Sequence, residues 1–128
     1  MQVITTLNAQ SPIGPYAQAI VANGFLFCSG HAGVDPHINQ IVEGIEPQTR
    51  QVLHNLHAVL VAAGATLYHV VQVTVYLKQM DDFTSMNAIY ARMFGDHKPA
   101  RTTIAVSALA KPGALVVMDR IAVVPAVS

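Results

Sequence analysis

The feature that most constrains the fold is a long amphipathic segment followed closely by a segment of two-residue alternation. Residues 46–64 (EPQTRQVLHNLHAVLVAAG) repeat apolar side chains at helical spacing, Pro47 suits the first turn, and Gly64 suits the position just past the helix end. Residues 70–78 then alternate, which predicts Val71, Val73, Val75 and Leu77 on one side and Gln72, Thr74, Tyr76 and Lys78 on the other. This order indicates a helix packed against a sheet.

The other expected elements follow from turn residues and apolar spacing. Asn23-Gly24 is a strong signal for a tight hairpin and separates two strands. A second helix is expected to start at an aspartate and to cover residues 81–94. Shorter patterns predict an edge strand at residues 2–6, final strands at 101–109 and 114–124, and an irregular connection over 31–44.

The order of these elements predicts an α+β fold. One mostly antiparallel or mixed sheet would carry both helices on one face, and residues 1–128 would form a single domain. The other face combines Gln72, Thr74 and Tyr76 with many apolar side chains, which is too apolar to remain in water. We therefore expect copies of the chain to cover this face in a closed homo-oligomer.

Composition excludes several classes of protein. Seven basic and seven acidic residues balance, so there is no charge signature for nucleic acid or an anionic membrane surface. A single cysteine, Cys28, excludes an internal disulfide and a thiolate metal cluster. No apolar run has the length of a membrane span, and the start (MQVITTLNAQ) lacks the pattern of a signal peptide, so a cytoplasmic location is expected.

Several motifs, in a fixed order, resemble the RidA/YjgF family of reactive-intermediate deaminases over essentially the whole chain. They are SPIGPYAQAI (11–20), CSGHAGVDP (28–36), QTRQVLHNLHAVLVAAG (48–64), VVQVTVYLKQMDDFTSMNAIY (70–90), PART (99–102) and RIAVV (120–124). The resemblance implies a chorismate-mutase-like subunit and a homotrimer with an inner β-barrel and outer helices. Three ligand clefts would lie between neighbouring subunits.

The same resemblance implies an activity. Family members hydrolyse enamines and imines such as 2-aminoacrylate to 2-oxo acids and ammonia, a form of metabolite damage control, without a metal or an organic cofactor. This corresponds to a 2-iminobutanoate/2-iminopropanoate deaminase.

The resemblance also assigns the site residues. Arg101 would hold the substrate carboxylate, and its planar guanidinium suits a bidentate contact with that group. The remaining expected substrate contacts are Tyr16, Ser29, Gly30, Phe83, Asn87 and Thr103. Packing in a loop explains Tyr16 equally simply, and packing in the core is the favoured explanation for Phe83, so these two assignments stay open.

Three positions depart from the family pattern. His31 replaces a usual glutamine, and Thr103 replaces a cysteine found in many members. More seriously, Val117 (or Val116, if the AKPG turn is aligned without its extra residue) falls where deaminases carry a glutamate that positions the attacking water. Asp119 is the nearest carboxylate, two residues further along the same strand face and about 7 Å away.

Two functions remain open on these grounds. One is a deaminase in which Asp119 or His31 replaces the missing glutamate as the catalytic acid–base group, since histidine can serve this role near neutral pH. The alternative is a non-catalytic or weakly catalytic binder of small carboxylates that uses the same cleft. Ribonuclease activity, attributed to some family members, fits poorly with a net charge of zero.

Overall fold

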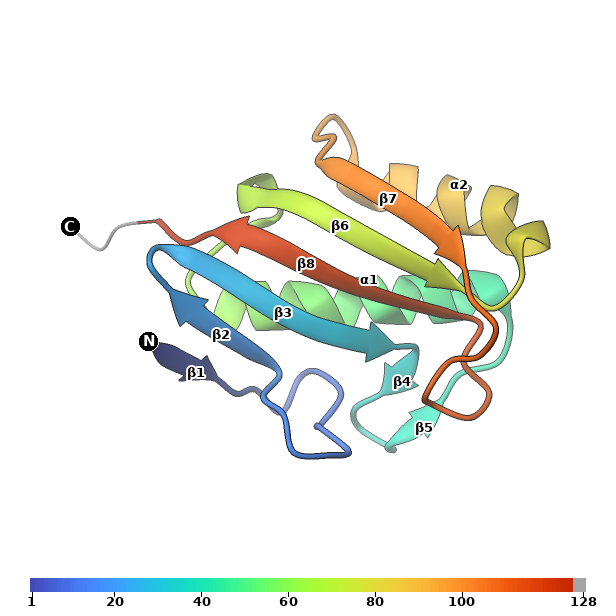
Figure 1. The fold of residues 1–128 in the computed structure, drawn as a ribbon, viewed down its shortest axis with the longest axis horizontal. Coiled ribbons are helices and arrows are strands. Elements are labelled where there is room, and N and C mark those ends of the chain that lie inside the picture. The colour runs from blue at the N-terminus through green and yellow to red at the C-terminus, as the bar shows by residue number, and fades with distance from the viewer. Residues whose placement is uncertain (126–128) are drawn as a thin grey trace.

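The computed structural model describes residues 1–125 and shows two helices packed on one face of a sheet (Figure 1). The expected α+β class with a mixed sheet and a single helical layer is confirmed. The strands are β1 (Gln2–Ile4), β2 (Ala19–Ala22), β3 (Phe25–Ala32), β4 (Val34–Asp35), β5 (Gln40–Ile41), β6 (Val70–Leu77), β7 (Ala100–Ala105) and β8 (Val116–Val123). The helices are α1 (Ile45–Ala62) and α2 (Phe83–Phe94), each preceded or followed by short 3₁₀ turns at Leu67–His69 and Met80–Asp82.

The main sheet has the strand order β1-β2-β3-β8-β6-β7, so the last strand of the chain lies in its middle. All neighbours are antiparallel except β6 and β7, which are parallel and are connected through α2. Strand β7 therefore forms one edge of the sheet beside α2 (Figure 1). This edge carries the PAR motif.

Local sequence rules explain the first hairpin and the end of α1. Asn23 and Gly24 have φ angles of 57° and 80°, and Ala22 pairs with Phe25 across the turn. Two consecutive positive φ angles define the type I′ turn that Asn-Gly favours. Gly64, with φ of 79°, lies just beyond the C-terminus of α1 as expected.

Three buried polar side chains of α1, Gln48, Thr49 and Asn55, add contacts that the apolar stripe does not predict. The Gln48 amide donates to the Gly113 carbonyl oxygen at 2.9 Å and accepts from the Leu115 N–H at 2.8 Å. The Asn55 Nδ2 donates to the carbonyl oxygen of Val34 at 2.9 Å. These bonds attach α1 to the loops at one end of the sheet, and buried amides need such partners.

Two expectations were wrong in detail. The segment 31–44 contains the end of β3 and a small β4–β5 hairpin instead of an irregular connection. In β6 a register shift between Val70 and Gln72 places Val70 in the core and leaves Val71 exposed. An extra residue in a strand reverses the alternation on one side of it, which the sequence pattern alone does not reveal.

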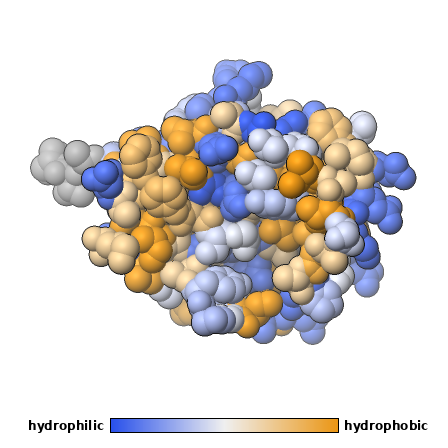
Figure 2. All heavy atoms as spheres, viewed as in Figure 1, coloured by the Kyte–Doolittle hydropathy of each residue, from blue (hydrophilic) through white to orange (hydrophobic). Residues whose placement is uncertain are grey.

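The sheet face opposite the helices, called here the open face, is uncovered in the single chain. It carries Val3, Phe25, Phe27, Ile104 and Val123, each between 39% and 61% exposed. Figure 2 shows this side of the molecule, where apolar atoms lie among polar ones. Within residues 1–125, no helix is long and apolar enough to cross a membrane.

Candidate functional site

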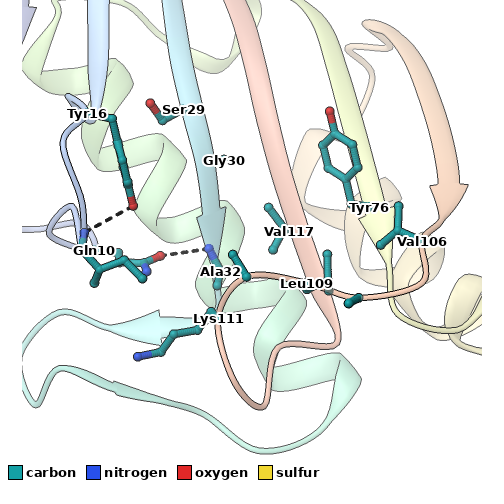
Figure 3. A pocket seen from close by; sticks show the side chains of 13 residues that line it. Gln10, Tyr16, Ser29, Gly30, Ala32, Tyr76, Val106, Leu109, Lys111 and Val117 are labelled. Carbon is teal, nitrogen blue, oxygen red and sulfur yellow. Dashed lines mark hydrogen bonds between the residues drawn. The ribbon is translucent and has the colours of Figure 1, made fainter.

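A cavity of about 460 Å³ opens at one end of the open face, between β3, β8, β6 and the loop that follows β7 (Figure 3). Four of its lining residues, Tyr16, Ser29, Gly30 and Val117, are sequence-predicted site residues. Tyr76, Gln10 and Lys111 also line it. The structure therefore brings together four of the ten predicted site residues.

A β-bulge shapes the wall formed by Ser29 and Gly30. Cys28 pairs with Arg120 and His31 pairs with Met118, so Ser29 and Gly30 both lie opposite Asp119. The Ser29 hydroxyl donates to the Ala17 carbonyl oxygen at 2.6 Å, and so its proton is already used. A Cβ atom at Gly30 would lie 3.0 Å from Cγ1 of Val117, which means that a glycine keeps this wall open.

The loop before β2 supplies the opposite wall. Tyr16 is half exposed, and its hydroxyl accepts a hydrogen bond from the Ile13 N–H at 3.4 Å. Gln10 is buried and accepts from the Ala32 N–H at 2.9 Å (Figure 3). These bonds hold the loop against β3, which leaves the ring of Tyr16 on the cavity wall.

Val117 contributes only hydrocarbon to the cavity, and the nearest acidic group is reached through Tyr76. The Tyr76 hydroxyl donates to Asp119 Oδ2 at 3.0 Å, while Asp119 itself does not line the cavity. Burial and this hydrogen bond to the carboxylate raise the pKa of Tyr76. The phenol therefore keeps its proton at neutral pH, and its oxygen remains available to accept a hydrogen bond.

His31 lies away from the cavity because the bulge reverses the alternation of β3. Its ring is buried on the helix side of the sheet, and Nδ1–H donates to the Ser29 carbonyl oxygen at 2.8 Å. Burial is the largest influence on the pKa of His31 and lowers it. The catalytic role expected for His31 has no support in this placement.

Four more predicted site residues lie on the helix side at the edge strand β7, namely Arg101, Phe83, Asn87 and Thr103. Arg101 Nη1 donates to Asn87 Oδ1 at 2.7 Å, and the guanidinium carbon lies 4.7 Å from the ring centroid of Tyr90 and 5.7 Å from that of Phe83. An amide and two rings thus fix the direction of the guanidinium. None of these groups neutralises its charge.

A cavity of about 410 Å³ adjoins Arg101 between α2 and the start of β7. Lys98 and His97 also line it. Two residues further along β7 on the same side, the buried Thr103 hydroxyl has no hydrogen-bond partner within residues 1–125. The region therefore offers positive charge and an unused hydroxyl, which suits a carboxylate.

The two cavities share no lining residue, because Arg101 and Val117 lie on opposite faces of the sheet. Sequence reasoning missed Tyr76, Tyr90 and Lys111. The alternation in residues 70–78 placed Tyr76 on the polar side of its strand, but it could not show that Val117 lies alongside. Tyr90 and Lys111 reach their cavities through tertiary packing, which leaves no pattern in the sequence.

Metal binding has no support in the part of the chain that the structure describes. No three histidine, cysteine, aspartate or glutamate side chains in residues 1–125 are grouped for a metal ion. Cys28 is buried, and burial raises the pKa of its thiol to about 11, so it is not a nucleophile at neutral pH.

A model of the endoribonuclease L-PSP family matches residues 6–124. The chain therefore belongs to the RidA/YjgF family. A RutC family protein of Pyrococcus horikoshii is 55% identical over 111 residues, which are 86% of this chain and 88% of that relative. Reactive Intermediate Deaminase A of Arabidopsis thaliana is 43% identical over 109 residues, 84% of this chain and 58% of that protein. The RidA/YjgF family thus includes reactive-intermediate deaminases.

Solved structures of RidA/YjgF proteins have the same fold. A Rid family protein of Yersinia pestis superposes with a TM-score of 0.93 at 46% identity and covers 96% of this chain and 98% of its own. Escherichia coli TdcF with bound serine superposes with a TM-score of 0.92 at 30% identity and covers 96% and 98%.

Proposed function

We propose that the chain is a hydrolytic deaminase of small 2-imino and 2-enamino acids, and that its site forms between two copies in a homotrimer. The observation that carries this proposal is the division of the predicted site into two incomplete halves. One half supplies the cation Arg101, and the other supplies the Gly30 bulge and the Tyr76 hydroxyl. Family membership supports this arrangement, as does the serine in TdcF, a small molecule with an α-carboxylate.

The uncovered open face supports the assembly. Its apolar side chains would be buried if the sheets of three subunits faced one another in an inner β-barrel. The edge strand β7 of one subunit would then meet the open-face cavity of its neighbour. Arg101 would enter a site that its own chain cannot complete.

In the proposed reaction, the substrate carboxylate binds Arg101, beside the hydroxyl of Thr103 and the amide of Asn87. The enamine is protonated to an imine, and water then adds to the imine carbon. Transfer of a proton to nitrogen releases ammonia and leaves the 2-oxo acid. Because the imine is already reactive, orientation of the two reactants provides much of the required acceleration.

Tyr76 and Asp119 are the groups proposed to position the water. The Tyr76 oxygen can accept a hydrogen bond from water while its own proton is held by Asp119. This arrangement orients water but does not make Tyr76 a base, since the raised pKa keeps it protonated. The Tyr76–Asp119 pair therefore provides the orientation of water that a glutamate at position 117 would give, but not its action as a base.

A weakly catalytic or non-catalytic binder of 2-oxo acids is the second candidate, and the hydrocarbon side chain of Val117 favours it. Ammonia release from an enzymatically generated imino acid separates the two candidates. Release above the uncatalysed rate supports the deaminase, whereas saturable binding of 2-oxobutanoate without any acceleration supports the binder.

Co-expression of two defective subunits tests the shared site directly. Arg101→Ala removes the cationic half, and Gly30→Leu fills the open-face cavity, so each variant alone should bind no 2-oxobutanoate. In trimers that contain both variants, about one third of the clefts, one in each trimer, would combine two intact halves. Calorimetry on doubly tagged mixed trimers should recover this fraction. No recovery in well-folded mixed trimers would show that the site is not shared between subunits.

A further inference from the structure

We propose that a second ligand site lies between the two helices, where Arg120 binds a small monocarboxylate anion with a short apolar tail. This site adjoins the Arg101 cavity, with which it shares Phe94 as a wall, but it does not depend on the function proposed above. Arg120 belongs to the central strand β8 and is 1% exposed, which makes it one of the most deeply buried side chains. No described residue accepts a hydrogen bond from its Nε, Nη1 or Nη2.

A buried guanidinium without acceptors is costly. Desolvation of an ion in a protein interior costs several kcal/mol, and all of its N–H donors require partners. The ring of Phe94, with its centroid 5.2 Å from the guanidinium carbon, provides only a partial compensation. Within residues 1–125, the Arg120 guanidinium therefore lacks the oxygen acceptors that its buried N–H groups require.

The charge of Arg120 is also unneutralised by its surroundings. Cys28, Tyr90 and His31 are the titratable groups that interact with it, and none of them carries a negative charge at pH 7. Asp119, its neighbour in sequence, lies on the open face and binds Tyr76. Burial lowers the pKa of Arg120 to about 10, which still leaves the guanidinium protonated at neutral pH.

A cavity of about 210 Å³ leads from Arg120 to the surface between α1 and α2. Leu53 and Phe94 form its buried wall, Leu67 and Met93 are half buried, and His54 and His57 are exposed at its rim. In Figure 1 both helices lie behind the sheet, so this cavity is on the side away from the open face. It would remain accessible when the open face is covered.

The shape and lining of the cavity indicate the class of ligand. The guanidinium fork matches the two oxygens of a carboxylate, the leucine, methionine and phenylalanine walls suit a short hydrocarbon tail, and the rim imidazoles can donate to an outer oxygen. One negative charge balances one buried positive charge. A phosphate dianion would leave an excess negative charge beside an apolar wall.

The test uses Arg101→Ala protein, so that carboxylates cannot bind at the proposed cleft. The methyl signal of Met93 and the ring signals of His54 and His57 are followed by NMR during titration with sodium butanoate at constant ionic strength. We expect these signals to shift along one saturable curve. The neutral butanamide should produce no such shifts.

Two further variants in the same background make the assignment specific. Arg120→Met should weaken butanoate binding at least about tenfold, because it removes the charge but keeps the apolar volume. Leu67→Trp fills the cavity mouth without altering Arg120 and should have the same effect, so the test does not depend on one variant folding. Lys78→Met, which removes an exposed charge outside all three cavities, should change nothing.

Three results would overturn the proposal. Butanoate shifts that do not saturate, or that butanamide reproduces, would show that there is no anion site. Saturation that persists in both Arg120→Met and Leu67→Trp would place the anion elsewhere. Saturation with inorganic phosphate but not with butanoate would refute the carboxylate assignment.

Discussion

The two faces of the central sheet differ in how far a single chain completes them. On the helix face, Val73, Val75 and Met118 are fully buried beneath α1 and α2. On the open face, Phe25 and Phe27 remain 41% and 46% exposed beside the polar Tyr76–Asp119 pair. The helix face is thus completed within one chain, whereas the open face remains available for the subunit contact and the ligand proposed above.

The difference between the two faces is tested most directly by placing a charged residue on each of them and measuring the oligomeric state. We expect Phe27→Asp to convert a homotrimer into monomers, because the new carboxylate would be buried without a partner between subunits. Val61 provides a matched control, since it is an exposed apolar residue of α1 on the other side of the molecule. Light scattering at micromolar concentration should report about three subunits for Val61→Asp. Monomeric wild-type protein would contradict the role given to the open face.

The next largest effect is expected at the sheet edge, where Arg101 is proposed to complete the open-face cavity of a neighbouring subunit. Arg101→Ala should weaken 2-oxobutanoate binding on the order of a hundredfold or more, because it removes a bidentate charge-assisted contact. Arg101→Lys should recover little, since one ammonium cannot reproduce the planar fork. Arg92→Ala, an exposed arginine of α2, serves as the control. Calorimetry measures the affinity for 2-oxobutanoate. Wild-type affinity in Arg101→Lys would refute the proposed contact between the Arg101 guanidinium and the substrate carboxylate.

A smaller effect, an increase in the rate of ammonia release, is expected when an acidic side chain is restored on the open face. Val117→Glu should raise the rate of ammonia release from 2-aminoacrylate by about ten- to a hundredfold, since a positioned acid–base group contributes at least this much in suitable surroundings. Val117→Gln has nearly the same shape without the charge and should give no gain. The comparison of initial rates isolates the carboxylate.

The same assay tests the groups already present. If Tyr76 and Asp119 position the water, Asp119→Asn should lower the rate, and Val117→Glu should partly restore it in the double variant. His31→Ala should have little effect on the rate, because the ring lies on the helix side. A strong loss in His31→Ala together with an unchanged fold would reverse this assignment.

The sequence predicted those parts of the fold that local rules determine. The Asn23-Gly24 turn and the apolar stripe of α1 depend on neighbouring residues, and both were confirmed. The two register shifts, at Ser29-Gly30 and at Val71, depend on which strand lies alongside, and local alternation contains no information on this. The first shift turned His31 away from the cavity where the sequence had suggested an acid–base role.

The candidate site also combines features that the local sequence predicts with features that only tertiary packing determines. The PAR motif identified Arg101, but its stacking on Tyr90 and its separation from Val117 depend on tertiary packing. Arg120 finds no hydrogen-bond acceptor within residues 1–125, not even its sequence neighbour Asp119, and nothing in the sequence indicated this. Alternate residues of a strand face opposite sides of a sheet, so this pair is separated by the sheet itself.

The last prediction concerns the dry helix face and is a dependence of stability on pH. Burial raises the pKa of the Cys28 thiol to about 11, compared with about 8.5 in an unfolded chain. The folded state therefore holds this proton more tightly, so its contribution is fully present below about pH 8.5 and is lost as the pH rises towards 11. The loss is on the order of 3 kcal/mol of unfolding free energy at its upper limit.

Urea unfolding under reducing conditions at pH 7 and 10.5 measures this loss. Cys28→Ala serves as the reference, because Tyr76 and Tyr90 titrate in both proteins. We expect wild type to lose more stability than Cys28→Ala over this interval, and equal losses would mean that the thiol is not in a dry environment.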